Sequence, residues 1–120
     1  MSATIVLTPD LVQGERISSA VAWPAGMSTV TATGLLSNQD IAAATNALNS
    51  FAIDVSFDGG KTFQQGNNTP WVGNTLDRSG NPVPPSTNLS YDVAHLPTHV
   101  QVRIDSPGTL SIGASVEFSA

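Results

Sequence analysis

Residues 110–118 read L-S-I-G-A-S-V-E-F, and the side chain at every second position is apolar. Residues 100–104 (V-Q-V-R-I) and 51–57 (F-A-I-D-V-S-F) show the same alternation of apolar with polar or small side chains. Successive side chains of a β-strand point to opposite faces of the sheet, so a period of two predicts strands with one face in the core. These three stretches predict antiparallel sheet and decide the fold class.

Three stretches upstream also predict strands, because each is rich in β-branched or apolar residues and ends at a turn signal. They cover residues 3–8, 16–23 and 28–36. Residues 106–109 (S-P-G-T) predict a tight turn that joins 100–104 to 110–118 as a hairpin. Short strands separated by Pro, Gly and Asn are typical of all-β folds. We therefore expect a single-domain antiparallel β-sandwich, jelly-roll-like, over residues 1–120.

Two stretches do not follow the strand pattern. Residues 38–48 are rich in alanine, which fits a short helix, but the asparagines at 46 and 49 fit a loop equally well. Residues 64–90 carry Pro82, Pro84 and Pro85 and lack a regular alternation. Since proline removes a backbone donor, we expect 64–90 to form a long irregular loop region. Long loops in compact domains are often shaped by function or by a partner.

The composition excludes several classes of function. The 120 residues carry a net charge of −5 with four basic residues, and these are scattered along the chain. Binding to nucleic acid or to an anionic membrane needs a basic stripe, so we expect neither partner. The chain has no cysteine, no basic and apolar start typical of a signal peptide, and no apolar run of membrane-spanning length. We expect synthesis in the cytoplasm.

Residues 56–63 (S-F-D-G-G-K-T-F) resemble the Asp-box, a hairpin motif of the form S-x-D-x-G-x-T-W/F. An aspartate can accept backbone hydrogen bonds in such a turn, and two glycines allow the positive φ of a reversal. We expect Phe63 to anchor the hairpin in the core. The resemblance implies a structural role away from any catalytic site; a calcium or sugar contact at Asp58 is the alternative. The motif residues are Ser56, Asp58, Gly59, Gly60, Thr62 and Phe63.

The order of segments along most of the chain resembles small β-sandwich proteins of tailed bacteriophages that are encoded among virion structural genes. The resemblance implies a non-enzymatic virion protein, most simply a capsid decoration or minor capsid protein. Its implied partners are the major capsid protein or tail and neck components. It also implies a homo-oligomer, for which a trimer is a candidate, and a location in the virion. The Asp-box is the sharp motif within this resemblance.

Two segments are candidate contact surfaces because they are poor in charge. The first is the N-terminal segment 1–13, where an uncharged β-branched run precedes Pro9 and could add a strand to another chain. The second lies within 64–90. The candidate interface residues are Ile5, Val6, Leu7, Trp71, Pro82, Val83, Pro84 and Pro85.

A carbohydrate- or receptor-binding module is the alternative function. Trp23, Trp71 and Tyr91 could together form a platform for a sugar ring, although such residues also serve as core. Enzymatic chemistry has little support. Pro97 lies between His95 and His99 and prevents the helical spacing of metal ligands. We expect no catalytic residue, no metal and no cofactor.

Overall fold

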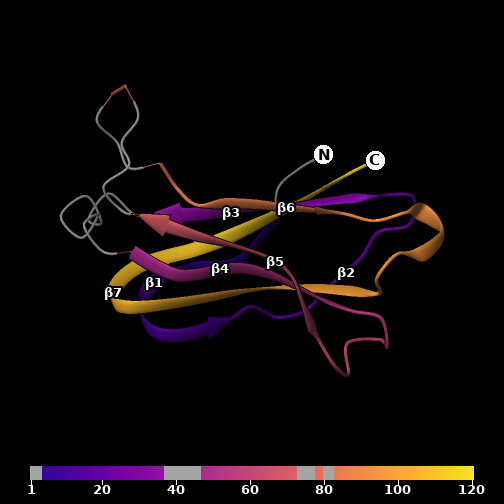
Figure 1. The fold of residues 1–120 in the computed structure, drawn as a ribbon, viewed down its shortest axis with the longest axis horizontal. Coiled ribbons are helices and arrows are strands. Elements are labelled where there is room, and N and C mark those ends of the chain that lie inside the picture. Colours follow the sequence, from indigo (N-terminus) through magenta and orange to yellow (C-terminus); the bar gives the residue numbers. More distant parts are fainter. Residues whose placement is uncertain (1–3, 37–46, 73–77, 80–82) are drawn as a thin grey trace.

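The computed structural model describes residues 4–36, 47–72, 78–79 and 83–120. Most of these residues belong to strands, and one turn of 3-10 helix, η2 (Val93–His95), precedes the last strand. Figure 1 shows the strands along the long axis of the molecule. The strands are β1 (Thr4–Ile17), β2 (Val21–Ala22), β3 (Thr29–Leu36), β4 (Ala47–Ser56), β5 (Gln64–Val72), β6 (Ser86–Ser90) and β7 (His99–Ser119).

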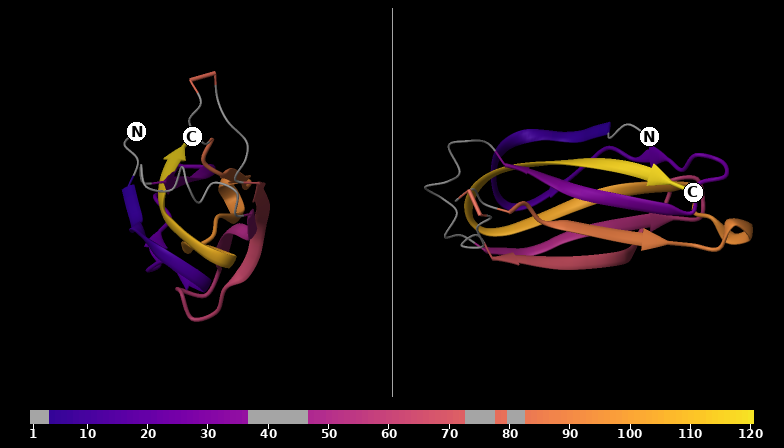
Figure 2. Two further views of the ribbon diagram at one scale, coloured as in Figure 1. Left: turned by 90° about the vertical axis from the view of Figure 1, so that its left-hand side faces the viewer. Right: turned by 90° about the horizontal axis from the view of Figure 1, so that it is seen from above.

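The long strand β7 organises the topology, because it pairs with four other strands. Its first half pairs with β4 and its second half with β3, in registers that include Ile104↔Phe51 and Phe118↔Val30. Strands β5 and β6 extend the outer sides of β4 and β3, giving the order β5-β4-β7-β3-β6. All pairs are antiparallel. The layer that contains β4 and β5 and the layer that contains β3 and β6 pack face to face (Figure 2). The predicted all-β antiparallel sandwich is confirmed.

The predicted tight turn at 106–109 is wrong, because β7 runs through this segment as one bent strand. In a hairpin, 100–104 would pair with 110–118; instead β1 pairs with both stretches, through Arg16↔Ile104 and Val12↔Leu110. Between Gly14↔Ser106 and Val12↔Leu110, β1 has one residue and β7 has three. The extra residues include a proline and a glycine, which are tolerated where a bulge bends a strand. The bend carries β7 and β1 from one layer to the other (Figure 1).

A second bulge brings β1 very close to β7. Between Leu7↔Ala114 and Asp10↔Ile112, β1 has two residues and β7 has only Gly113. A Cβ at Gly113 would collide with Leu7 O and would lie 2.6 Å from the nitrogen of Pro9. The crossing therefore requires a glycine here. The Arg16 guanidinium donates to the carbonyls of Thr8 (2.8 Å) and Ile112 (3.2 Å), which ties the bulge to both strands.

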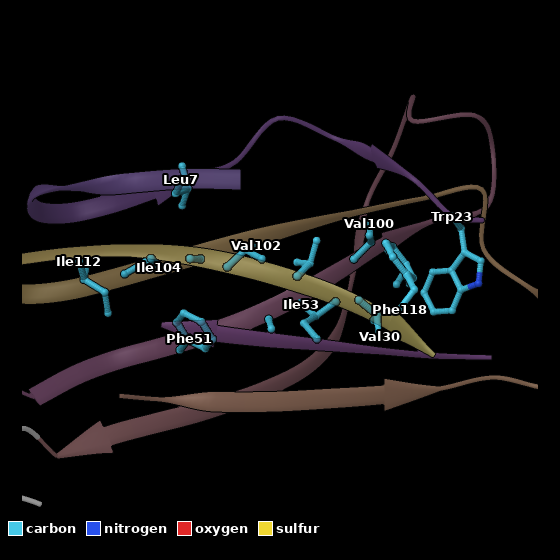
Figure 3. Close-up of a cluster of buried hydrophobic side chains, with 14 residues drawn as sticks. Leu7, Trp23, Val30, Phe51, Ile53, Val100, Val102, Ile104, Ile112 and Phe118 are labelled. Carbon is cyan, nitrogen blue, oxygen red and sulfur yellow. The ribbon is translucent and has the colours of Figure 1, made fainter. Parts of the chain in front are cut away.

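The core fills the space between the two layers (Figure 3). Phe51, Ile104 and Ile112 are completely buried toward one end of the cluster, and Trp23 and Phe118 close the other end. The indole Nε1 of Trp23 donates to the carbonyl of Met27 (2.8 Å), so this buried ring leaves no unpaired donor. Apolar residues at alternate positions of β3, β4 and β7 supply most of the core, as their period of two predicts.

Other boundaries differ from those predicted. Residues 64–90 are not one irregular loop, because 64–72 form β5 and 86–90 form β6. β5 is polar and contains Pro70, both of which an edge strand tolerates when its partner supplies the pairing. Pro9 does not end the first strand; β1 continues to Ile17 across the bulge. The stretch 38–48, for which the sequence leaves both a short helix and a loop open, falls largely outside the described residues, and β4 already includes Ala47 and Leu48.

Candidate functional site

The turn between β4 and β5, residues 56–63, is organised by one carboxylate. Asp58 Oδ1 accepts hydrogen bonds from the Ser56 hydroxyl (2.7 Å) and from the amides of Lys61 (3.1 Å) and Thr62 (3.0 Å). The Thr62 hydroxyl donates to Oδ2 (2.5 Å). Ser56 Oγ in turn accepts from the Gly60 amide (2.9 Å). These contacts fix the turn with the side chains of three of its eight residues. We call this segment the hairpin turn.

The hairpin turn is also attached to β7. The hydroxyl of Thr98, the residue before β7, accepts from the Gly59 amide (3.0 Å) and donates to the carbonyl of Ser56 (3.1 Å). The Thr98 amide donates to the same carbonyl (2.8 Å). Gly59 and Gly60 have backbone φ values of 80° and 92°, which residues that carry a side chain rarely adopt. The turn is therefore held by its own side chains and by the neighbouring strand.

Hydrogen bonding fixes the charge of Asp58. Donation from the Thr62 hydroxyl, and then from the Thr62 amide and the Ser56 hydroxyl, holds the pKa of the Asp58 carboxyl well below its usual value of 3.8. A carboxylate with several donors is stabilised in its charged form. Asp58 is thus ionised throughout the neutral and mildly acidic range.

A pocket of about 220 Å³ lies beside the hairpin turn. Phe63 lines it and is only partly buried, so the expectation that Phe63 anchors the core is wrong. Phe57, expected on the apolar face of its strand, also lines the pocket and is 48% exposed. Both residues lie in the turn, after the end of β4 and before the start of β5. We call this the hairpin pocket; its lining residues are Val55, Phe57, Asp58, Thr62, Phe63 and Gln64.

An aromatic chain links the hairpin pocket to the core. Phe57 packs edge-to-face on Tyr91 (ring centroids 5.8 Å apart), and Tyr91 packs edge-to-face on Trp23 (5.9 Å). Trp23 packs on Phe118 (5.2 Å) inside the core. Burial raises the pKa of the Tyr91 hydroxyl. Two members of the predicted aromatic platform, Trp23 and Tyr91, are thus in contact, but Trp23 is only 8% exposed and serves as core.

The predicted N-terminal contact surface is only partly accessible. Ile5 is 60% exposed, Val6 is partly buried against the core, and Leu7 belongs to the core at 8% exposed. Leu7 is therefore corrected from interface to core residue. The side of β1 opposite β7 is paired with no other described strand, and Figure 2 shows this strand at the margin of the molecule. We call residues Thr4–Thr8 the β1 edge.

The second predicted contact surface is also divided. Val83 and Pro84 are exposed, whereas Pro85 is buried, and its ring lies 2.7 Å from where a Cβ of Gly34 would be. The carbonyl of Pro85 accepts from the Gly34 amide (2.8 Å). The prediction of Pro85 as an interface residue is therefore wrong, because its ring packs against β3. Pro82 and the Trp71 side chain lie outside what the structure describes.

One polar cluster on the outer face of the sheet was not predicted. The carboxylate of Asp54, which is only 5% exposed, accepts hydrogen bonds from Arg103 Nε (3.0 Å) and from the side-chain Nε2 of Gln101 (3.2 Å). Arg103 also donates to Gln65 Oε1 (2.9 Å). The alternation of apolar and polar residues places these side chains on the polar faces of their strands. Whether they contact one another depends on the register of β4 with β5 and β7. No sequence signal gives that register.

The residues weighed for enzymatic chemistry do not form a shared site. Asp54 pairs with Arg103, and Asp58 holds the hairpin turn. His95 is exposed, and its Nδ1 lies 3.9 Å from Asp92 Oδ2. His99 Nδ1 lies 3.1 Å from the Thr98 hydroxyl. In the described part of the chain, no three His, Cys, Asp or Glu residues group closely enough to hold a metal ion. No helix there is long and apolar enough to cross a membrane.

Comparison with solved structures gives a distant likeness. No family model and no curated protein matches the chain. A variant of Xylanase10C from Cellvibrio japonicus, solved in complex with xylopentaose, aligns with a TM-score of 0.43 and 19% sequence identity. The alignment covers 86% of this chain and 20% of that one, so this chain spans about a fifth of the xylanase. A likeness this low carries no argument about function.

Proposed function

We propose that this chain is a non-enzymatic structural protein of a tailed-phage virion that binds the assembled particle through the β1 edge. The observation that carries the binding mode is the outer side of Thr4–Thr8, which pairs with no other described strand and lies next to an Ile5 side chain that is 60% exposed. The virion setting is supported by the sequence resemblance alone. The proposed partner is the major capsid protein or a tail or neck component.

The chemistry of the β1 edge suits strand addition. Its five residues are uncharged, and it contains neither lysine nor proline, the residues that commonly block exposed edges. A partner strand would gain main-chain hydrogen bonds along this edge, and the alternating side chains would give specificity. Ile17, at the far end of β1, is a second exposed apolar residue of the same strand (46% exposed).

Binding of this kind would stabilise the particle by mass action. A protein that binds the assembled lattice better than its separate subunits shifts the equilibrium toward the assembly. A closed homo-oligomer, such as a trimer, would place several β1 edges on one lattice symmetry axis and multiply the contact. In this proposal the chain is made in the host cytoplasm and resides in the virion.

The test begins with mass spectrometry of purified virions, where the chain should be present. Virions lacking it are then mixed with the purified chain and sedimented, and the bound fraction is measured against concentration. Ile5→Lys should weaken binding at least about tenfold, because a lysine on an edge opposes strand addition. Light scattering over a hundredfold concentration range gives the oligomeric state.

Val93→Lys is the matched control, since Val93 on η2 is 59% exposed and Ile5 is 60% exposed. It should bind virions as the wild type does. Thermal melting must show both variants folded. Absence of the chain from virions would overturn the virion assignment. Equal binding by Ile5→Lys and wild type would overturn the β1 edge as the contact.

A further inference from the structure

We propose that the hairpin pocket binds a single pyranose ring of a glycan. This site is separate from the β1 edge and does not depend on the proposed role in a virion. Three features of the described residues carry the inference: the size of the pocket, its two phenyl rings, of which Phe57 is held by Tyr91, and a polar rim whose carboxylate is held in place.

The size suits one ring. The hairpin pocket encloses about 220 Å³, below the range of roughly 300–1,000 Å³ of pockets that take drug-sized ligands. It is open to solvent, because Phe57, Asp58, Thr62 and Gln64 are all exposed. A ring can therefore enter while the rest of a glycan chain remains outside.

One of the apolar walls is held in place by a neighbouring ring. Val55, completely buried, lines the pocket together with Phe57 and Phe63. Phe57 is 48% exposed, yet its ring is held by the edge-to-face contact with Tyr91. Tyr91 is in turn held by Trp23, which Figure 3 shows at the end of the buried cluster. An exposed aromatic ring fixed in advance loses little conformational entropy on binding and can pack against the C–H face of a sugar.

The polar rim can satisfy sugar hydroxyls. Asp58 Oδ2 accepts one described hydrogen bond, from the Thr62 hydroxyl, whereas Oδ1 accepts three. Oδ2 therefore has capacity for a further donor, as the three donors on Oδ1 of the same group illustrate. The exposed Gln64 amide supplies both a donor and an acceptor. The same rim can thus accept from one hydroxyl and donate to another.

The charge balance favours a neutral ligand over a cation. Four hydrogen bonds to Asp58 already offset part of its negative charge, and Lys61 places an ammonium group in the same turn. A lysine or arginine side chain from a partner would therefore gain less from the carboxylate. A hydroxyl-rich ring with an apolar face matches the mixed surface better.

The experiment is a titration of the ¹⁵N-labelled full chain with a panel of methyl pyranosides, followed by amide chemical shifts. We expect at least one sugar to bind with a Kd in the millimolar range and to shift amides of residues 55–64 selectively. Phe57→Tyr keeps the ring and should keep the affinity. Phe57→Leu keeps an apolar side chain without the ring and should lose about tenfold or more.

Ile5→Lys is the control, because it alters the β1 edge and should leave sugar affinity unchanged. Phe57→Leu should conversely leave virion binding unchanged, so the failure of one proposal is distinguishable from the failure of the other. The pocket assignment is overturned if no pyranoside shifts residues 55–64, or if Phe57→Leu binds as the wild type does. It is also overturned if guanidinium or methylammonium shifts these amides and no sugar does.

Discussion

Gly113→Ala tests whether the crossing of β1 over β7 holds the two layers together. Gly113 is the single β7 residue opposite the two-residue bulge of β1. A Cβ there would collide with Leu7 O and would lie 2.6 Å from the nitrogen of Pro9 and 2.8 Å from the carbonyl carbon of Thr8. Ordinary contact begins near 3.4 Å, so β1 must move by at least 0.8 Å at Pro9 (3.4 minus 2.6).

The expected cost is about 3 kcal/mol, the upper end of the usual range for overpacking, because all three obstructing atoms belong to the backbone. Side-chain rotation cannot relieve them; the strand itself must shift. The shift would also strain the pairing around Leu7, whose side chain is part of the core. For a chain of this length, about 3 kcal/mol corresponds to a fall in Tm of roughly 12 °C.

Gly66→Ala is the matched control, measured beside Gly113→Ala by urea and thermal unfolding. A Cβ at Gly66 would meet mainly the end of the Leu89 side chain, which can rotate away; the next atom, Ile53 O, is 3.1 Å away. We expect it to cost about 1 kcal/mol or less. Both changes remove a glycine from the unfolded chain, so that entropic effect cancels in the comparison. Equal stability of the two variants would refute the reasoning.

Three further predictions concern the charged groups and the hairpin turn. The pKa of Asp58 is lower in the folded chain than in the unfolded chain. The contribution of Asp58 to stability is therefore fully present above its pKa in the unfolded chain and is lost as the pH falls through its pKa in the folded chain. The stability gap between wild type and Asp58→Asn, measured by urea unfolding from pH 7 to pH 2, should therefore narrow in acid; a constant gap would contradict this. Arg103→Met should cost about 3 kcal/mol by leaving the carboxylate of Asp54 buried without its partner, and Asp54→Asn in the same chain should recover part of that loss. Thr98→Val should cost about 1 kcal/mol by removing the acceptor of the Gly59 amide, and hydrogen exchange of that amide should rise; unchanged exchange would count against the contact.

The elements that sequence predicts well are those in which neighbouring residues carry the signal. The period of two in 51–56, 100–104 and 112–118 gives real strands with the expected buried faces. The contacts of Asp58 within the hairpin turn follow from residues only two to four positions away. Local chemistry is sufficient in both cases.

Prediction failed where distant partners decide. A proline and a glycine at 107–108 fit a tight turn as well as a bulge, and only pairing with β1, about 90 residues earlier, selects the bulge. β5 shows no alternation, yet pairing with β4 makes it a strand. Phe57 continues the apolar period of its strand, but β4 ends at Ser56, and the half-exposed ring lines the hairpin pocket instead of the core.

The central position of β7 has a consequence for the order of folding during synthesis. β1, β2, β3 and β4 all pair with β7, so neither layer is complete before residues 99–119 have left the ribosome. Pairing of Thr4 with Val116 closes a loop of more than a hundred residues, the kind of non-local contact that slows folding. Until then the hydrophobic faces of β3 and β4 lack their partner strand. Aggregation of the nascent chain is therefore favoured until β7 has been synthesised and paired.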